Sequence, residues 1–237
     1  MTRPFARIGV VGVLVAVMST ALLFVFPTKA PGMPDGFATP IIAFEFAQCA
    51  RDVQTLFGPA GSPEREAMVR SMDLGNLLDY VYMVLYSAFI ALFSMKIAKR
   101  TGQKIYYVPA GLAALALMGD ALENLRLFAI AGGLETMEIE ADLAALNVLT
   151  WIKWGSLSMA FLFLAPYFLK GGKFAVTIGV ICAFCPVLGV IAFFKSGAFC
   201  EMFSVSVALL FLLTIIYSLI YKEKRSLRDV MEATAGK

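Results

Sequence analysis

Six long apolar runs restrict what this chain can fold into. They cover residues 8–26, 77–95, 105–131, 143–169, 174–194 and 202–221. An α-helix needs about 20 apolar residues to cross the roughly 30 Å hydrocarbon core of a bilayer, and each run reaches that length. The chain is also 60% hydrophobic and only 16% charged, whereas soluble proteins are about 25% charged. We therefore predict an all-α integral membrane protein, a six-span helical bundle with an outer amphipathic helical loop.

The first apolar run has two interpretations. It could be a signal peptide, because Arg3 and Arg7 precede it and Ala30 offers a small residue for cleavage. The apolar part of a signal peptide is usually roughly 7–15 residues, however, and Pro31 follows Ala30 directly. Its length therefore favours a first transmembrane helix. The predicted divisions are an N-terminal flank with the first span at 1–26, an outer helical loop at 27–76, the remaining five spans at 77–221 and a tail at 222–237.

The Lys and Arg residues outside the spans set the orientation. Thirteen lie on the side of the two termini and five lie on the other side, where the loop 135–142 carries only acidic charges. Cytoplasmic loops of membrane proteins are enriched in Lys and Arg, so both termini are predicted to be cytoplasmic. The net charge of +3 is small and its basic residues are scattered, which argues against nucleic acid as a partner. The partner that this composition requires is a lipid bilayer.

The outer loop contains two start signals for helices. Thr39 followed by Pro40 predicts the beginning of one helix over 40–57, and Ser62 followed by Pro63 predicts the beginning of a second. Apolar residues occupy a broad side of the first helix. We expect this helix to lie on the membrane face as a lid.

Four polar side chains interrupt the third apolar run within seven residues: Asp120, Glu123, Asn124 and Arg126. An ionised group near the centre of a bilayer costs about 2.5–3.5 kcal/mol on insertion scales, so such groups indicate a functional site by default. Asp120, Glu123 and Asn124 share one helix face, and Arg126 lies three residues after Glu123. With a rise of about 1.5 Å per residue, all four are expected in the outer half of their span.

The two neighbouring spans bring further charges to the same depth. Asp79 is expected near the outer end of the second span, on one face with Tyr82 and Tyr86. Lys153 is expected about 15 Å below the outer end of the fourth span. These two charges and those of the third span form a predicted outer layer of three carboxylates and two cations.

Aromatic residues accompany these charges. Trp151 and Trp154 flank Lys153 and offer a cation–π contact or a flat apolar wall. Glu45, between two Phe residues of the outer loop, would add a fourth carboxylate. The predicted ligand-binding residues are therefore Glu45, Asp79, Tyr82, Tyr86, Asp120, Glu123, Asn124, Arg126, Trp151, Lys153 and Trp154.

Two functional interpretations remain open for this layer. In the first, the layer forms an outward-facing acidic pocket that binds a small polar or cationic ligand, an ion or a lipid headgroup, and the protein either binds or transports this ligand. Alternatively, the charges pair and fix helix packing in an accessory subunit of a larger membrane complex or a homo-oligomer. An acid/base role for Asp120 and Glu123 in an enzyme ranks below binding. The chain has no His, which removes the commonest general base and metal ligand, and the sequence names no cofactor.

Four short motifs resemble those of a group of polytopic bacterial inner-membrane proteins. They are Phe44-Glu45-Phe46-Ala47, Leu78-Asp79, Asp120-x-x-Glu123-Asn124 and the late Lys153, in that order. This chain has Phe46 where the group usually has Leu, and its last two apolar runs have no match there. The group brings no established activity with it. The resemblance implies a bacterial inner-membrane location and a set of residues that act together: Glu45, Asp79, Asp120, Glu123, Asn124 and Lys153.

The four cysteines suggest a third function. Cys182 and Cys185 form a Cys-x-x-Cys motif in the fifth span, while Cys49 and Cys200 both fall on the outer side. This pattern is similar to that of quinone-linked membrane thiol oxidoreductases, and the oxidising outer side would permit a Cys49–Cys200 disulfide. The mid-membrane depth of Cys182 and Cys185 favours a packing role for them instead. The sequence leaves the disulfide open.

Overall fold

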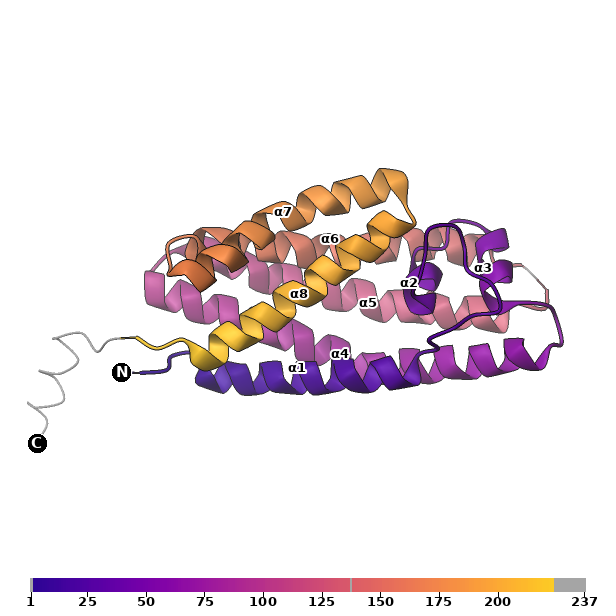
Figure 1. Cartoon of the computed structure of the whole chain (residues 1–237), viewed down its shortest axis with the longest axis horizontal. Helices are drawn as coiled ribbons and strands as arrows, with labels where there is room; N and C mark the ends of the chain where they lie inside the picture. Colours follow the sequence, from indigo (N-terminus) through magenta and orange to yellow (C-terminus); the bar gives the residue numbers. More distant parts are fainter. Residues whose placement is uncertain (1, 137, 224–237) are drawn as a thin grey trace, which may run out of the picture.

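The fold is built from six long helices that alternate in direction (Figure 1). The computed structural model describes residues 2–136 and 138–223, so the predicted tail lies outside the described residues from 224 onward. All six predicted spans are helical, and six helices are long and apolar enough to cross a membrane. The helices are α1 (Ala6–Val25), α2 (Pro40–Glu45), α3 (Ala50–Phe57), α4 (Pro63–Thr101), a 3-10 turn η1 (Lys104–Tyr107), α5 (Val108–Gly132), α6 (Glu140–Phe168), α7 (Lys173–Lys195) and α8 (Ala198–Ile220).

The long helices close into a ring. Helix α1 packs on α4, each later long helix packs on the one before it, and α8 returns to pack on α1. Close approach of α1 to its neighbours depends on glycine: a Cβ atom at Gly12 would lie 2.8 Å from Ile215 Cγ1 and 2.9 Å from Phe89 Cε2. The beginning of α1 and the end of α8 lie at one end of this bundle, the terminal end, and the short helices α2 and α3 lie at the other, the α2–α3 end (Figure 1).

Helix α4 extends well beyond the span predicted at 77–95. The predicted second helix of the outer loop and that span are one continuous helix of 39 residues. It begins as expected, with Pro63 at its first position and the Ser62 hydroxyl accepting a hydrogen bond from the Arg65 amide at 3.2 Å. The reason for its length is that no residue between Pro63 and the span breaks a helix. Gly75 instead provides room for the Phe26 ring, which an added Cβ would approach to 2.2 Å.

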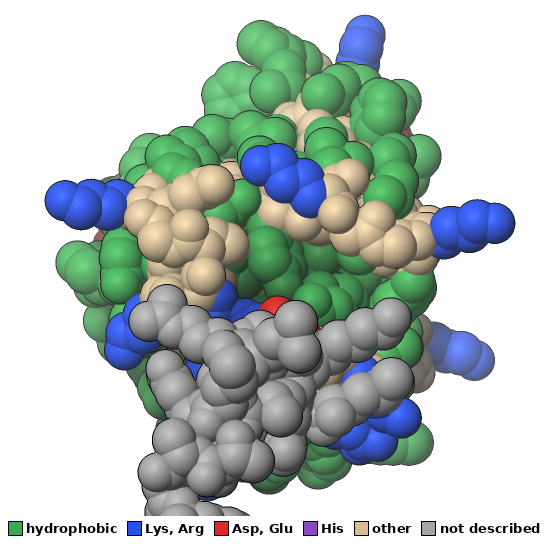
Figure 2. Space-filling model, turned by 90° about the vertical axis from the view of Figure 1, so that its left-hand side faces the viewer, with side chains coloured by type: hydrophobic (Ala, Val, Ile, Leu, Met, Phe, Trp, Pro, Cys, Tyr) green, Lys and Arg blue, Asp and Glu red, His purple; other side chains and the backbone are tan. Residues whose placement is uncertain are grey.

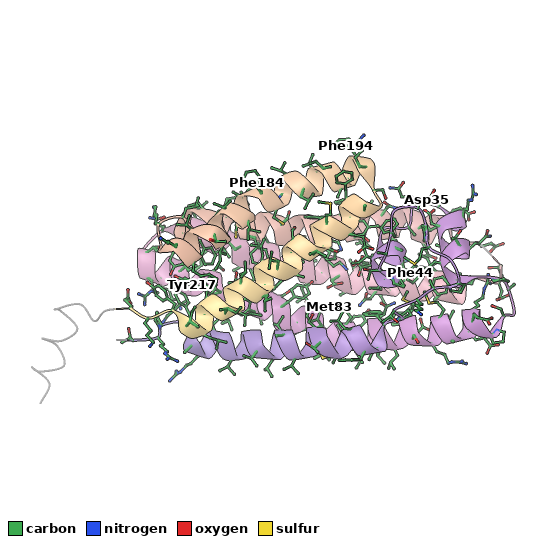
Figure 3. All side chains as sticks on the ribbon, viewed as in Figure 1. Asp35, Phe44, Met83, Phe184, Phe194 and Tyr217 are labelled. Atoms are coloured by element: carbon green, nitrogen blue, oxygen red, sulfur yellow. The ribbon has the colours of Figure 1, made fainter. Side chains whose placement is uncertain are left out.

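The predicted helix over 40–57 is wrong in one respect, because it is two helices. Helix α2 ends at Glu45 and α3 begins at Ala50. The Asp52 carboxylate accepts hydrogen bonds from the amides of Gln48 at 2.9 Å and Cys49 at 3.2 Å, which caps a new helix start. The break lets α2 enter the end of the bundle, where Phe44 is fully buried, instead of lying on an outer face. Figure 3 shows Phe44 among the helices, whereas Phe184 and Phe194 of α7 lie on its outer side.

The terminal end carries a ring of basic side chains. In Figure 2, which faces this end, Lys and Arg side chains project around a hydrophobic centre. The exposed basic residues at this end come from the N-terminal segment, the helix ends and turns, and the residue after Tyr221: Arg3, Arg7, Lys99, Arg100, Lys104, Lys170, Lys173 and Lys222.

Candidate functional site

A buried lysine on α6 is the centre of the candidate site. Lys153 is 5% exposed, and its Nζ lies 3.1 Å from Glu45 Oε2 and 3.3 Å from Asp120 Oδ1. The Glu123 carboxylate forms a third ion pair with the same ammonium. Three carboxylates from α2 and α5 therefore share one cation, and the structure brings together Glu45, Asp120, Glu123 and Lys153, which the sequence analysis expected in one layer.

The packing of α5 against α6 brings these groups together. Asp120, Glu123 and Asn124 lie on the buried face of α5, as their spacing predicted. Gly119 lies on the same face, and an added Cβ there would lie 3.0 Å from the backbone nitrogen of Lys153. The missing side chain allows the backbone of α6 to approach α5, so the lysine enters the cluster at close range.

Neutral donors also contact the same carboxylates. The Tyr86 hydroxyl donates to Asp120 Oδ2 at 2.6 Å, and Trp154 Nε1 donates to Glu45 Oε2 at 2.9 Å. The Thr150 hydroxyl lies 2.7 Å from Glu123 Oε1 and 3.0 Å from the Glu45 carbonyl oxygen. Asp120 and Glu123 are therefore held through both of their carboxylate oxygens, whereas Lys153 and Trp154 share Glu45 Oε2.

Asp79 stands apart from the lysine. Asn124 Nδ2 donates to Asp79 Oδ2 at 2.9 Å and lies 3.2 Å from the carbonyl oxygen of Asn76. Asp79 is half-buried, and no ion pair reaches its carboxylate within residues 2–136 and 138–223. It is the carboxylate of the cluster that has no cation beside it.

The cluster contains an excess of negative charge. If all side chains are ionised, four carboxylates and one ammonium leave a net charge of −3. Burial raises the pKa of the Glu45 carboxyl above its usual range, since the loss of hydration outweighs the attraction of the Lys153 ammonium. Neutralising such a site requires bound protons or a bound cation.

Two predicted site residues lie elsewhere. Arg126 pairs with Asp142 in the first turn of α6 at 2.9 Å and is partly exposed, because its position on α5 is turned away from the buried face. The predicted balance of three carboxylates against two cations is therefore wrong. Trp151 packs against Phe46 and Phe203 instead of against the lysine. Trp154 takes the predicted role, with Lys153 Nζ 5.4 Å from its ring centroid.

A cavity of about 400 Å³ adjoins the cluster. Glu45, Asp79, Asp120 and Lys153 line it, as do Tyr82, Tyr86 and Trp154, whereas Glu123 is fully buried behind them. Its remaining walls come from α1, α8, the segment 38–42 and Leu157 of α6. The sequence analysis did not single out the lining residues of α1 and α8, which include Ser19, Leu22, Ser204, Val207 and Phe211. Such volumes, roughly 300–1,000 Å³, are those of small-molecule sites.

The segment before α2 is fastened across this cavity. The Glu201 carboxylate, in the first turn of α8, accepts hydrogen bonds from the Ala38 amide at 3.0 Å and from the Thr39 amide at 2.7 Å. The Thr39 hydroxyl donates to the same carboxylate at 2.8 Å, so it does not cap α2 as predicted. Sequence reasoning missed Glu201 because its partner lies 162 residues away.

The cysteines are separate from this site, and all four are free thiols. The candidate Cys49–Cys200 disulfide is absent: Cys49 is exposed at the start of α3, whereas Cys200 is buried, with its Sγ 3.8 Å from the Ala192 carbonyl oxygen. Cys182 and Cys185 are both buried in the packing of α7. Cys185 Sγ lies 3.3 Å from the Ser206 hydroxyl of α8.

Comparisons with known proteins add no assignment for this site. Searches against protein families, curated proteins and solved structures found no match. Within residues 2–136 and 138–223, no group of three His, Cys, Asp or Glu side chains is placed to hold a metal ion. The chemistry of the cluster itself therefore carries the functional argument.

Proposed function

We propose that this chain is a multi-pass protein of the bacterial inner membrane whose pocket binds a small cationic ligand. The bound ligand is either retained at the site or transported. The observation that carries this proposal is the excess of carboxylates at the cavity. One ammonium is shared by three of them, and Asp79 faces the cavity with an amide as its polar partner. A cation that enters the cavity supplies the charge that the cluster lacks.

The proposed orientation has cytoplasmic termini. Basic side chains surround the terminal end in Figure 2, which supports this orientation through the enrichment of Lys and Arg on the cytoplasmic side. The cavity then lies toward the outer side, near α2. Helix α1 supplies one wall of the cavity and packs on α4 and α8, which supports its role as a retained span.

The proposal predicts saturable binding of a simple organic cation. The probe is butylammonium chloride, measured by isothermal titration calorimetry on the protein in phosphatidylcholine nanodiscs, with sodium chloride at matched ionic strength as reference. Asp79→Asn is the main variant, because the Asp79 carboxylate has no ion pair to lose. A hydrogen bond to a charged group contributes about 1.5–3 kcal/mol, so affinity should fall by at least about tenfold.

A matched variant tests where the charge acts. Asp142→Asn removes one carboxylate outside the cavity, where Asp142 pairs with Arg126. This variant should bind butylammonium within about twofold of the wild type. Absence of saturable binding in the wild-type protein, or equal loss in both variants, would contradict the proposal and favour the interpretation that the charges serve packing alone.

The binding should also depend on pH. The raised pKa of Glu45 means that this carboxyl takes up a proton at a higher pH than an exposed glutamate does. Protons and the organic cation then compete for the same negative charge, so affinity should fall as the pH is lowered. Calorimetry in buffers of different ionisation enthalpy should detect protons released on binding, and an affinity that rises with acidification would contradict this step.

A further inference from the structure

We propose that the ligand is a long-chain primary amine, which enters the cavity sideways between α1 and α8. This inference rests on the proposed function and specifies the ligand class of the same site. Three observations carry it: the two kinds of wall in the cavity, the divergence of α1 and α8, and the charge at the floor.

The cavity has walls of two chemical kinds. Its floor is acidic, with Asp79 and Asp120 of adjacent helices. Its sides are apolar and come from three other helices: Leu22 and Leu23 of α1, Leu157 of α6, and Val207, Ala208 and Phe211 of α8. A small hydrophilic cation uses only the floor, whereas a cation with an attached hydrocarbon chain uses both surfaces.

Helices α1 and α8 touch at one end and separate toward the other. Near the terminal end, an added Cβ at Gly9 would lie 2.7 Å from Leu219 Cδ2, and Gly12 lies as closely against Ile215. Toward the α2–α3 end, α8 runs diagonally away from α1 (Figure 1). The cavity lining includes the separated parts: residues 19–27, which are the last part of α1 and the two residues after it, and residues 204–211 of α8.

The borders of this opening are apolar and exposed. Leu23 on α1 is 70% exposed, and Ala208 on α8 is also exposed; both line the cavity. In a bilayer, such side chains face the hydrocarbon region. A ligand that approaches from the membrane therefore keeps its chain in an apolar environment while its head reaches Asp79.

The floor selects the head group by charge. Lys153 is the cation among the residues that line the cavity, and its ammonium already faces three carboxylates. An anionic head would meet a net negative cluster without a free cation to hold it. Asp120 Oδ1 is buried and accepts no hydrogen bond, although it lies 3.3 Å from Lys153 Nζ. A primary ammonium, with three N–H donors, matches such acceptors.

Photolabelling tests this inference. The probe is dodecylamine with a diazirine near the end of its chain, added to the protein in phosphatidylcholine nanodiscs. Peptide mapping should place the adduct on 19–27, at the end of α1, or on 204–211 of α8. Excess butylammonium should reduce this labelling at least about fivefold. The matched control probe has the same chain with a carboxylate head, and butylammonium should not compete with its labelling.

Two tryptophan variants test the route of entry. Ala208→Trp places a large ring in the opening and should lower the competed labelling at least about tenfold. Val205→Trp adds the same ring on the exposed side of α8, outside the cavity lining, and should retain it. Size-exclusion profiles and thermal unfolding check that both variants fold. If a variant does not fold, the labelling pattern of the wild-type protein still tests the sideways route.

The outcomes separate this inference from the proposed function. If butylammonium binds but the two segments are labelled equally by both probes, or without competition, the long-chain ligand class is refuted and the cation site remains. If butylammonium does not bind to the wild-type protein, both proposals fail. Labelling confined to α7 or other exposed faces also refutes the sideways route.

Discussion

Replacing Lys153 with methionine removes the cation that three buried carboxylates share. Methionine keeps a flexible chain of similar length, so the change is mainly one of charge. The ammonium contacts Glu45 at 3.1 Å and Asp120 at 3.3 Å and pairs with Glu123, whose side chain is completely buried. The net charge of the cluster changes from −3 to −4 if all groups stay ionised.

The expected cost is large because the carboxylates remain buried without their partner. Removing one member of a buried ion pair typically costs about 3–5 kcal/mol. At roughly 2–4 °C per kcal/mol for a chain of this size, the Tm should fall by about 6–20 °C. The measurement is thermal unfolding of the purified protein in detergent at neutral pH, followed by intrinsic tryptophan fluorescence.

Lys170→Met is the matched control, since Lys170 is exposed in the turn between α6 and α7. Its Tm should stay within about 2 °C of the wild type. Lowering the pH supplies protons that neutralise the carboxylates left without a cation, so the deficit of Lys153→Met should shrink on acidification. A Lys153→Met protein as stable as Lys170→Met, or a deficit that grows on acidification, would refute the reasoning that this lysine neutralises the cluster.

Two further predictions concern packing and the segment across the cavity. Gly12→Leu should destabilise the protein by about 1–3 kcal/mol in the same thermal assay, because the larger side chain overpacks against Ile215. Gly111→Leu should be neutral, since an added Cβ at Gly111 meets nothing within 4 Å. Glu201→Ala removes the acceptor of three hydrogen bonds from 38–39, so limited trypsin digestion should cut after Lys29 at least about fivefold faster than in the wild type. An unchanged cleavage rate would mean that this carboxylate does not hold the segment.

Local sequence patterns predicted the long helices and the centre of the cluster. An uninterrupted apolar run of about 20 residues leaves few alternatives to a helix, because its backbone groups must be paired internally. Asp120, Glu123 and Asn124 all lie on the buried face of α5, because the period of an α-helix fixes which residues share a face. Lys153 joined them because consecutive antiparallel helices bring residues of equal depth together.

Local patterns could not predict which charged residues pair, or that α8 packs on α1. Arg126 follows Glu123 by three residues, yet it pairs with Asp142 of α6, because the rotation of α5 in the bundle turns Arg126 away from the buried face. The walls from α1 and α8 arise because the last helix returns to the first, a contact across most of the chain that leaves no local pattern. The break after Glu45 depends on two features together. Asp52 caps the start of α3, and the break allows the side chains of α2 to be buried in the bundle, which a local pattern does not reveal.

The distribution of the carboxylates supports the proposed ligand binding over a role in packing alone. Charges that only lock helices together need balanced pairs, and apolar residues of similar volume would serve packing equally well. Here the buried carboxylates of Glu45, Asp120 and Glu123 surround one ammonium, which fixes α2, α5 and α6 relative to one another. Asp79 adds a negative charge at the cavity and is held by the Asn124 amide, so it contributes no ion pair to that packing. A carboxylate that packing does not require, placed where a cavity begins, is the feature that a cationic ligand explains.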